Sequence, residues 1–161
     1  MENLTDVLLW FSTVSVALMA GVYFTFSAFV MRSLDAIATP AGMLAMQSIN
    51  RIIVRSPFLP IFFGSTLACA ALVIISSLSL ASAGALWTLI GSVAYVVGMF
   101  GVTIIGNVPL NDRLEAAQAD SPEGREMWSL YLRKWTAWNH VRTIACTAAL
   151  ALMILAISER I

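Results

Sequence analysis

The chain has 161 residues, of which 60% are hydrophobic and only 11% are charged. Soluble domains carry about 25% charged residues, so this composition and the mean hydropathy of +0.87 exclude an ordinary soluble domain. The nine basic and nine acidic residues balance, which gives no overall field of the kind that attracts nucleic acid. We therefore expect a small multi-pass protein of the lipid bilayer, with no nucleic-acid partner.

The first apolar run extends from Val7 to Met31 and ends at Arg32. It is long enough to cross a bilayer as a helix, for which about 20 residues suffice. Its second half is rich in rings, and Tyr23 and Phe26 are candidates for lining a pocket that accepts a flat aromatic molecule. A lipid-facing aromatic belt is the alternative.

A short amphipathic helix is predicted at 41–55, because Thr39-Pro40 before it has the cap and proline pattern of a helix start. Gln47, Asn50 and Arg51 are spaced so that they project together from one side of this helix. They are candidates for binding a ligand. The wet face of an interfacial helix is the alternative.

Two further spans are predicted at 58–80 and 85–105, joined by a short uncharged link that makes them a helical hairpin. Small residues recur along the second of these spans and suit close packing against another helix. The helix that this face contacts is therefore either in the same chain, in another membrane subunit or in a second copy of the chain. The small residues are Gly91, Ala94, Gly98 and Gly101.

Polar residues surround Pro109, which follows the third span. Proline disfavours a helical conformation at Val108 and removes a backbone donor, so we expect the backbone to break here. Asn107 and Asn111 would then either cap the flanking helices or direct two amides at a ligand, with Asp112 beside them.

A second amphipathic helix is predicted at 122–137, after the helix-start pattern Asp120-Ser121-Pro122-Glu123. Aromatic residues recur along it at the spacing of one helix face, and Arg142 continues the stripe. The stripe is either a stacking wall or an aromatic belt at the membrane interface. Its rings are Trp128, Tyr131, Trp135 and Trp138.

The last apolar run, Ile144 to Ile157, is too short to cross the bilayer, so the fourth span must begin near Trp138, at 138–158. This start draws Asn139, Arg142 and the single histidine, His140, against the membrane. A central arginine costs about 2.5–3.5 kcal/mol on insertion scales, so such residues are rarely without a function. A snorkelling arginine is the alternative.

All basic residues except Arg160 lie in or beside the first and third connections. The positive-inside rule places these connections in the cytoplasm and both termini outside the cytoplasm, so that the chain crosses the cell membrane several times. The sequence thus predicts an all-α integral membrane four-helix bundle, formed by 1–161 as one domain with short interfacial helices. The polar residues fall into three sets, within 47–51, 107–112 and 139–142. In this bundle all three sets lie at the same end, as a ligand site requires.

Several stretches resemble the anthrone oxygenase-like family of small four-span membrane proteins, and they occur in the same order over most of the chain. The resemblance implies a membrane protein, and for members that act on polyketide anthrones it implies oxygenase activity. It rests on Gly21, Phe24, Phe26, Ser27, Val30 and Met31; Met46-Gln47 with Asn50; Asn107-Val-Pro109-Leu110-Asn111 with Leu114; and Trp135 with Trp138-Asn139-His140-Val-Arg142-Thr143.

Oxidation of an anthrone can proceed without a cofactor, because the deprotonated substrate passes an electron directly to dioxygen. Such a site needs a base, for which His140 is the candidate because imidazole exchanges protons near neutral pH. It also needs oxyanion donors, here Arg142, Asn139 and Asn111. His140 and Arg142 are about 200° apart on a helix, which is an objection to one shared pocket. Substrate contacts are expected from Gln47, Asn50, Arg51, Asn107, Asn111, Asp112, Tyr23, Phe26, Trp135 and Trp138.

Metal and haem sites are not expected. One histidine cannot give bis-histidine haem ligation, and Cys69 and Cys146 do not have zinc-site spacing. A mixed site with His140 and Asp112 is the remaining metal alternative. In another class, a non-enzymatic membrane protein would use the same polar cluster to bind or transport a small molecule.

Overall fold

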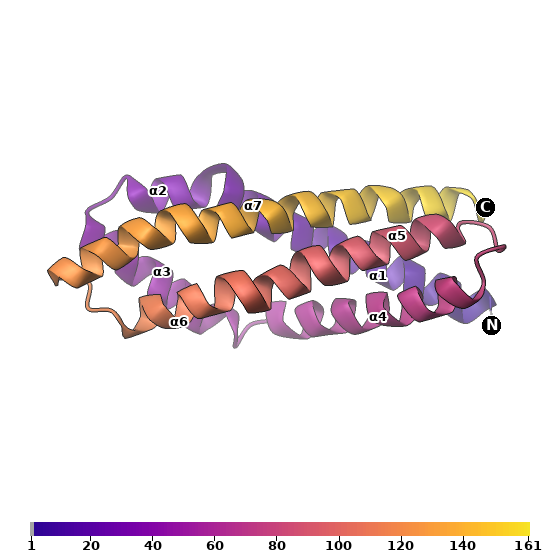
Figure 1. Ribbon diagram of the computed structural model, residues 1–161, viewed down its shortest axis with the longest axis horizontal. Coiled ribbons are helices and arrows are strands. Elements are labelled where there is room, and N and C mark those ends of the chain that lie inside the picture. Colours follow the sequence, from indigo (N-terminus) through magenta and orange to yellow (C-terminus); the bar gives the residue numbers. More distant parts are fainter. Residues whose placement is uncertain (1) are drawn as a thin grey trace.

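The computed structural model describes residues 2–161, and within this range it is helical with no strand (Figure 1). Three π-helical turns, named η, interrupt the α-helices. The elements in chain order are α1 (Glu2–Thr25), η1 (Phe26–Val30), α2 (Met31–Asp35), α3 (Thr39–Ile53), α4 (Phe58–Leu78), α5 (Ala85–Tyr95), η2 (Val96–Gly101), η3 (Thr103–Asn107), α6 (Val108–Ala116) and α7 (Pro122–Ser158).

Four helical stretches are long and apolar enough to cross a membrane. They run side by side, with both termini at the same end of the bundle (Figure 1). The expected all-α, four-span architecture is confirmed, and the chain is a multi-pass membrane protein. The four stretches are Leu4–Asp35, Phe58–Leu78, Ala85–Ala116 and Pro122–Ser158.

Helix α7 is continuous over 37 residues, so the expected amphipathic helix at 122–137 and span at 138–158 are one element. Its start was predicted correctly, because the Ser121 Oγ caps it by accepting a hydrogen bond from the Gly124 N–H at 2.9 Å. No proline or glycine follows Gly124 within the helix, so nothing ends the hydrogen-bond ladder at the membrane boundary. The polar cluster around His140 therefore lies in the middle of a helix.

The expected backbone break at Pro109 is wrong, since Val108 keeps helical dihedral angles. Proline would clash with the carbonyl group four residues earlier in a regular helix. Here the preceding turn, η3, widens instead, and the Val108 N–H bonds to the Thr103 carbonyl oxygen five residues back. Asn107 and Asn111 do not cap helices at this point, and both side chains bond elsewhere.

The aromatic stripe on α7 stays buried through Trp128, Tyr131 and Trp135, but Trp138 is 40% exposed and Asn139 takes the next inward position. The reason is that a straight helix drifts by about 20° per heptad against a strict 3.5-residue repeat. The rings of Trp128 and Tyr131 stack with centroids 5.9 Å apart, and those of Tyr131 and Trp135 at 5.6 Å.

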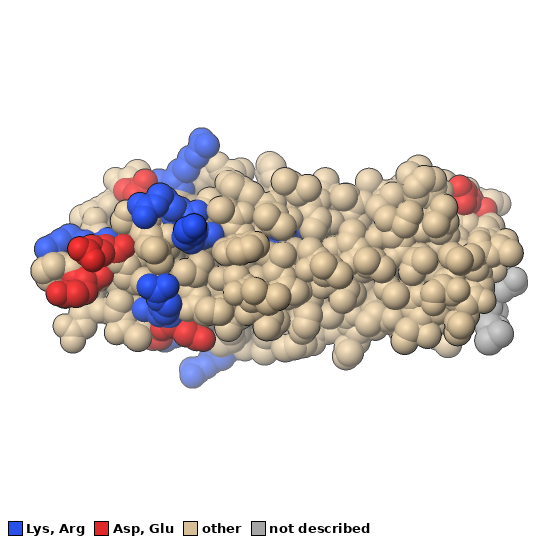
Figure 2. Space-filling view, viewed as in Figure 1, with Lys and Arg blue, Asp and Glu red and all other residues tan. Residues whose placement is uncertain are grey.

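Charged side chains gather at one end of the molecule, over α2, α3, α6 and the first turns of α7 (Figure 2). We call this the charged end. The opposite end carries the termini, and we call it the terminal end. There Glu159 accepts hydrogen bonds from the Gly84 N–H at 3.0 Å and Trp87 Nε1 at 2.8 Å, while Arg160 pairs with Asp6 at 2.5 Å. A long apolar surface lies between the two ends, as a bilayer requires.

Candidate functional site

A cavity of about 190 Å³ lies inside the bundle toward the charged end. It forms where α1 and η1, α3, the start of α4, η3 with α6, and α7 meet. Its walls are mainly apolar and aromatic, and a few polar groups reach it. Among the predicted site residues, those on its wall are Tyr23, Phe26, Asn50, Asn111, Trp135 and Arg142.

Arg142 is the charged residue on this wall, and it is only 5% exposed. Its guanidinium carbon lies 4.3 Å from the ring centroid of Tyr23 and 5.1 Å from that of Trp135. Nη2 donates to Asn139 Oδ1 at 2.7 Å, and Nη1 lies 3.4 Å from Thr103 Oγ1. Two rings and two neutral oxygens thus hold the cation in place.

No carboxylate pairs with Arg142 in the part of the chain that the structure describes. The two ion pairs found within residues 2–161 are Arg51 with Glu115 and Arg160 with Asp6, at the ends of the bundle. Arg142 Nε is buried without a hydrogen-bond acceptor, and so is the Nε1 of Trp135 on the same cavity wall. Because a buried charge without a counter-ion is costly, the cavity is suited to an anionic oxygen acceptor.

Asn139 connects Arg142 to the first span. It is fully buried, and its Nδ2 donates to the Tyr23 carbonyl oxygen at 2.8 Å and to Ser27 Oγ at 2.7 Å. Ser27 Oγ also lies 3.0 Å from His140 Nδ1. His140 is exposed and is not on the cavity wall. Of the three residues expected to be catalytic, Arg142 reaches the cavity, Asn139 supports it from behind, and His140 lies outside.

A small polar cluster marks the end of the cavity nearest the charged end. Tyr131 donates from its hydroxyl to Asn111 Oδ1 at 2.8 Å, and Asn50 Nδ2 lies 3.5 Å from the same hydroxyl. Asn50 and Asn111 both line the cavity, which joins residues of α3, α6 and α7 that are far apart in the sequence. The cavity therefore has a polar end in addition to its cationic wall.

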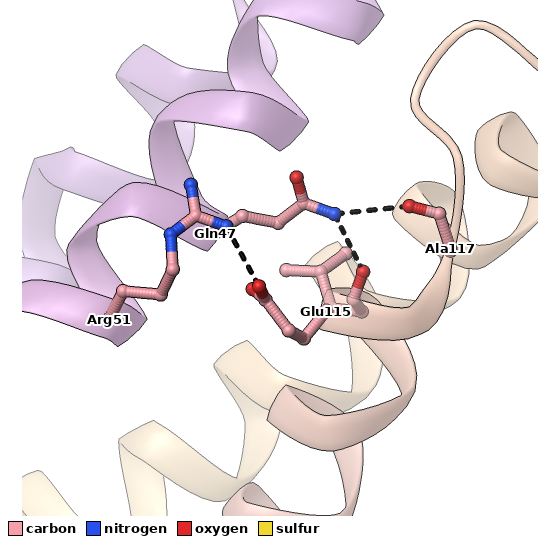
Figure 3. Close-up of polar contacts among 5 residues, drawn as sticks. Gln47, Arg51, Glu115 and Ala117 are labelled. Atoms are coloured by element: carbon pink, nitrogen blue, oxygen red, sulfur yellow. Dashed lines mark hydrogen bonds and ion pairs between the residues drawn. The ribbon is translucent and has the colours of Figure 1, made fainter.

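Two residues expected to bind substrate instead connect α3 to α6 (Figure 3). Gln47 Nε2 donates to the carbonyl oxygens of Leu114 at 2.8 Å and Ala117 at 3.1 Å, and Arg51 Nη1 bonds to Glu115 Oε1 at 2.8 Å. Gln47 thus donates to two carbonyl groups at the end of α6, where few intrahelical donors remain, and the Leu114 carbonyl oxygen also accepts a hydrogen bond from the Ala117 N–H at 3.2 Å. Neither side chain lines the cavity.

The other predicted contacts also lie off the cavity wall. Asn107 is buried, and its Nδ2 donates to the Trp135 carbonyl oxygen at 3.2 Å. Asp112 is exposed. The ring of Trp138 lies against Gly106, where an added Cβ would meet it at 2.7 Å.

Sequence reasoning missed part of the cavity. Phe58, Phe62 and Phe63 of α4 and Thr103 of η3 line it. The phenylalanines lie in a uniformly apolar span, so no periodic signal distinguished them. Thr103 lies in a π-helical turn, a feature that is frequent at functional sites but has no local sequence signature. Ser27 lies in another such turn, and the signal for it was its place among the residues that resemble the family.

Within residues 2–161 no three His, Cys, Asp or Glu side chains form a group that could hold a metal ion. Cys69 and Cys146 are buried free thiols.

Comparison with known proteins gives one family. The family model described as Anthrone oxygenase matches residues 58–152, which include much of the cavity wall and the Arg142 cluster. No curated protein and no solved structure matches the chain. Because the family match extends over more than half of its length, the chain belongs to the anthrone oxygenase family.

Proposed function

We propose that this protein is a membrane oxygenase that oxidises a flat, enolisable aromatic of the anthrone type, with Arg142 binding the ionised oxygen of the substrate. The observation that carries the proposal is a buried cation without a carboxylate partner among the described residues, on the wall of an aromatic cavity. Tyr23, Phe26 and Trp135 suit the faces and edges of a flat ring.

The chemistry follows from the charge of Arg142. An anthrone has an acidic CH₂ opposite its carbonyl group, and loss of one proton to water leaves an enolate whose charge lies largely on the oxygen. A fixed cation beside that oxygen favours the ionised form in a site of low dielectric constant. The enolate is electron-rich and can reduce dioxygen by one electron.

The remaining steps balance without another reductant. The substrate radical and superoxide combine at the former CH₂ carbon, and protonation gives a hydroperoxide. Loss of water from this species leaves a second carbonyl group. One oxygen atom of O₂ enters the quinone, the other leaves as water, and the two hydrogens of the CH₂ group balance the water. In this scheme Arg142 contacts the substrate, whereas Asn139 and Thr103 position Arg142.

Oxygen uptake by the purified protein with anthrone tests the proposal. We expect one quinone molecule to form for each O₂ consumed. The rate of oxygen uptake should exceed that of the spontaneous reaction without protein, and it should not change after treatment with a chelator. Arg142→Gln should lower kcat by about 10²–10³, the usual effect of removing one oxyanion donor. Arg133→Gln is the matched control, since Arg133 is exposed on the same helix.

Circular dichroism and gel filtration establish that each variant is folded, and Arg142→Lys keeps the charge if the glutamine variant is unstable. Equal rates in wild type and Arg142→Gln would contradict the role of Arg142. Binding of the substrate without any oxygen uptake would support the alternative of a non-enzymatic membrane protein that binds or transports a small anion.

A further inference from the structure

The most exposed residues of the cavity wall are apolar. Four of the residues that line the cavity are more than a third exposed, and we call them the rim. They come from the end of α3, from α4, and from η3 with α6. They are Val54 (52% exposed), Phe63 (47%), Ile104 (48%) and Val108 (37%). The polar lining residues Asn50 and Asn111 are less exposed than any of them.

Three of the four rim residues lie in stretches that are long and apolar enough to cross a membrane, and Val54 lies just outside them. Phe63 and Ile104 belong to two of the membrane-spanning stretches. Apolar side chains near them in the same helices are also highly exposed: Leu67 is 71% exposed and Ile105 is 77% exposed. Ile104 precedes Arg113 by nine positions, or about 13 Å along a helix, which places it inside the apolar band.

The size of the cavity adds a second constraint. An engineered cavity of about 150 Å³ in another protein holds one benzene molecule. The cavity of about 190 Å³ here therefore encloses one ring and its oxygen substituent, and it is too small for three fused rings. If the ionised oxygen lies at Arg142, the rest of a larger flat molecule must extend out of the cavity. The rim offers an apolar opening for it.

We propose that the substrate is a neutral enol or phenol dissolved in the lipid, which reaches Arg142 sideways between α4 and the η3–α6 segment. This proposal rests on the proposed function and specifies the substrate class. A neutral weak acid partitions into hydrocarbon, whereas its anion does not. It ionises beside Arg142, and the outer rings stay at the rim. The quinone product has no acidic hydrogen, so it loses its pairing with Arg142 and returns to the lipid.

Binding of 2-naphthol, a flat phenol, to the full-length protein in liposomes tests the route without requiring turnover. Its association is followed by the quenching of tryptophan emission. Ile104→Phe combined with Val108→Phe narrows the rim and should slow association by roughly tenfold or more. The matched control combines Ile105→Phe with Val97→Phe, two exposed positions off the cavity wall, and should bind at the wild-type rate.

A comparison of two flat phenols on the wild-type protein provides a test that depends on no variant. At equal aqueous concentrations, 2-naphthol should associate faster than the more polar 2,7-dihydroxynaphthalene, in proportion to its higher mole fraction in the membrane. Equal association rates at equal aqueous concentrations, or a rim variant that binds like the control, would overturn the lateral route. Rim-dependent binding without anthrone oxidation would instead overturn the proposed function alone.

Discussion

At the scale of single residues, the site depends on two neighbours that face opposite ways. Arg142 and His140 are two positions apart on α7, which rotates their side chains by about 200°. Arg142 faces the cavity, while His140 faces outward and contacts Ser27. Ser27 and Asn139 form the hydrogen-bonded connection between them. His140 thus lies off the cavity wall, and we propose that it positions Arg142 through Ser27 and Asn139.

The His140→Ala variant separates these two roles. If His140 only helps to orient Ser27 and Asn139, we expect kcat for anthrone oxidation to fall by about tenfold or less, well short of the loss in Arg142→Gln. Rates of the two variants and the wild type are compared in one oxygen-uptake assay. A loss in His140→Ala as large as that in Arg142→Gln would restore the assignment of His140 as the general base.

The sequence identified Arg142 and Asn139 as candidates, because polar residues inside an apolar span are conspicuous. It could not decide which of Arg142 and His140 faces the cavity, since that depends on the sides of α7 against which α1 and α5 pack. Gln47 and Arg51 show the same limit. Their shared helix face was predicted, but the carbonyl groups and carboxylate they bind belong to α6, more than sixty residues away.

At the scale of elements, the contact between η3 and α7 depends on Gly106. A Cβ added at Gly106 would lie 2.7 Å from Cγ and Cδ2 of Trp138, so Gly106→Ala must displace that ring or α7 itself. We expect a loss of about 1–3 kcal/mol in the free energy of unfolding, the usual range for overpacking. This loss of stability is detected as a lower midpoint temperature of thermal unfolding, with the wild type and the variant in the same detergent.

Gly101→Ala in η2 is the matched control, because its nearest atom is the Val96 carbonyl oxygen at 3.8 Å. Alanine there makes an ordinary contact and lowers the entropy of the unfolded chain, so its midpoint should equal or exceed that of the wild type. If both alanine variants shifted the midpoint equally, close contact with Trp138 would not be the cause.

Elements were predictable where local rules act alone. Ser121 and Pro122 start α7 as their types require, whereas Pro109 was expected to end a helix and instead follows a π-helical turn. That outcome depends on neighbouring helices, which keep the widened segment in place. The continuity of α7 through the membrane boundary was also missed, because hydropathy separates apolar from polar stretches and contains no information on where a helix ends.

At the scale of the whole molecule, the four-span bundle followed from composition, but the cavity did not. It forms where five segments converge, and its phenylalanines on α4 lie in a span without polar periodicity. Convergence of the polar sets at one end was expected from the alternation of spans. The structure divides these sets between the cavity, the α3–α6 connection and the surface.

The segregation of charge also predicts how the bundle is oriented. All basic residues except Arg142 and Arg160 lie at the charged end, so we propose that this end faces the cytoplasm and that both termini lie outside. Single cysteines can report this. The native Cys69 and Cys146 are buried, so a membrane-impermeant maleimide should leave the wild type unlabelled.

Ser82→Cys lies in the exposed loop at the terminal end, and Gln118→Cys in the exposed loop at the charged end. We expect the reagent to label Ser82→Cys in intact cells, and Gln118→Cys only after the membrane is permeabilised. The reverse pattern would contradict the proposed orientation, and equal labelling of both in intact cells would indicate insertion in both directions. Because the rim is nearer the charged end, the expected pattern would also place the lateral opening in the cytoplasmic half of the bilayer.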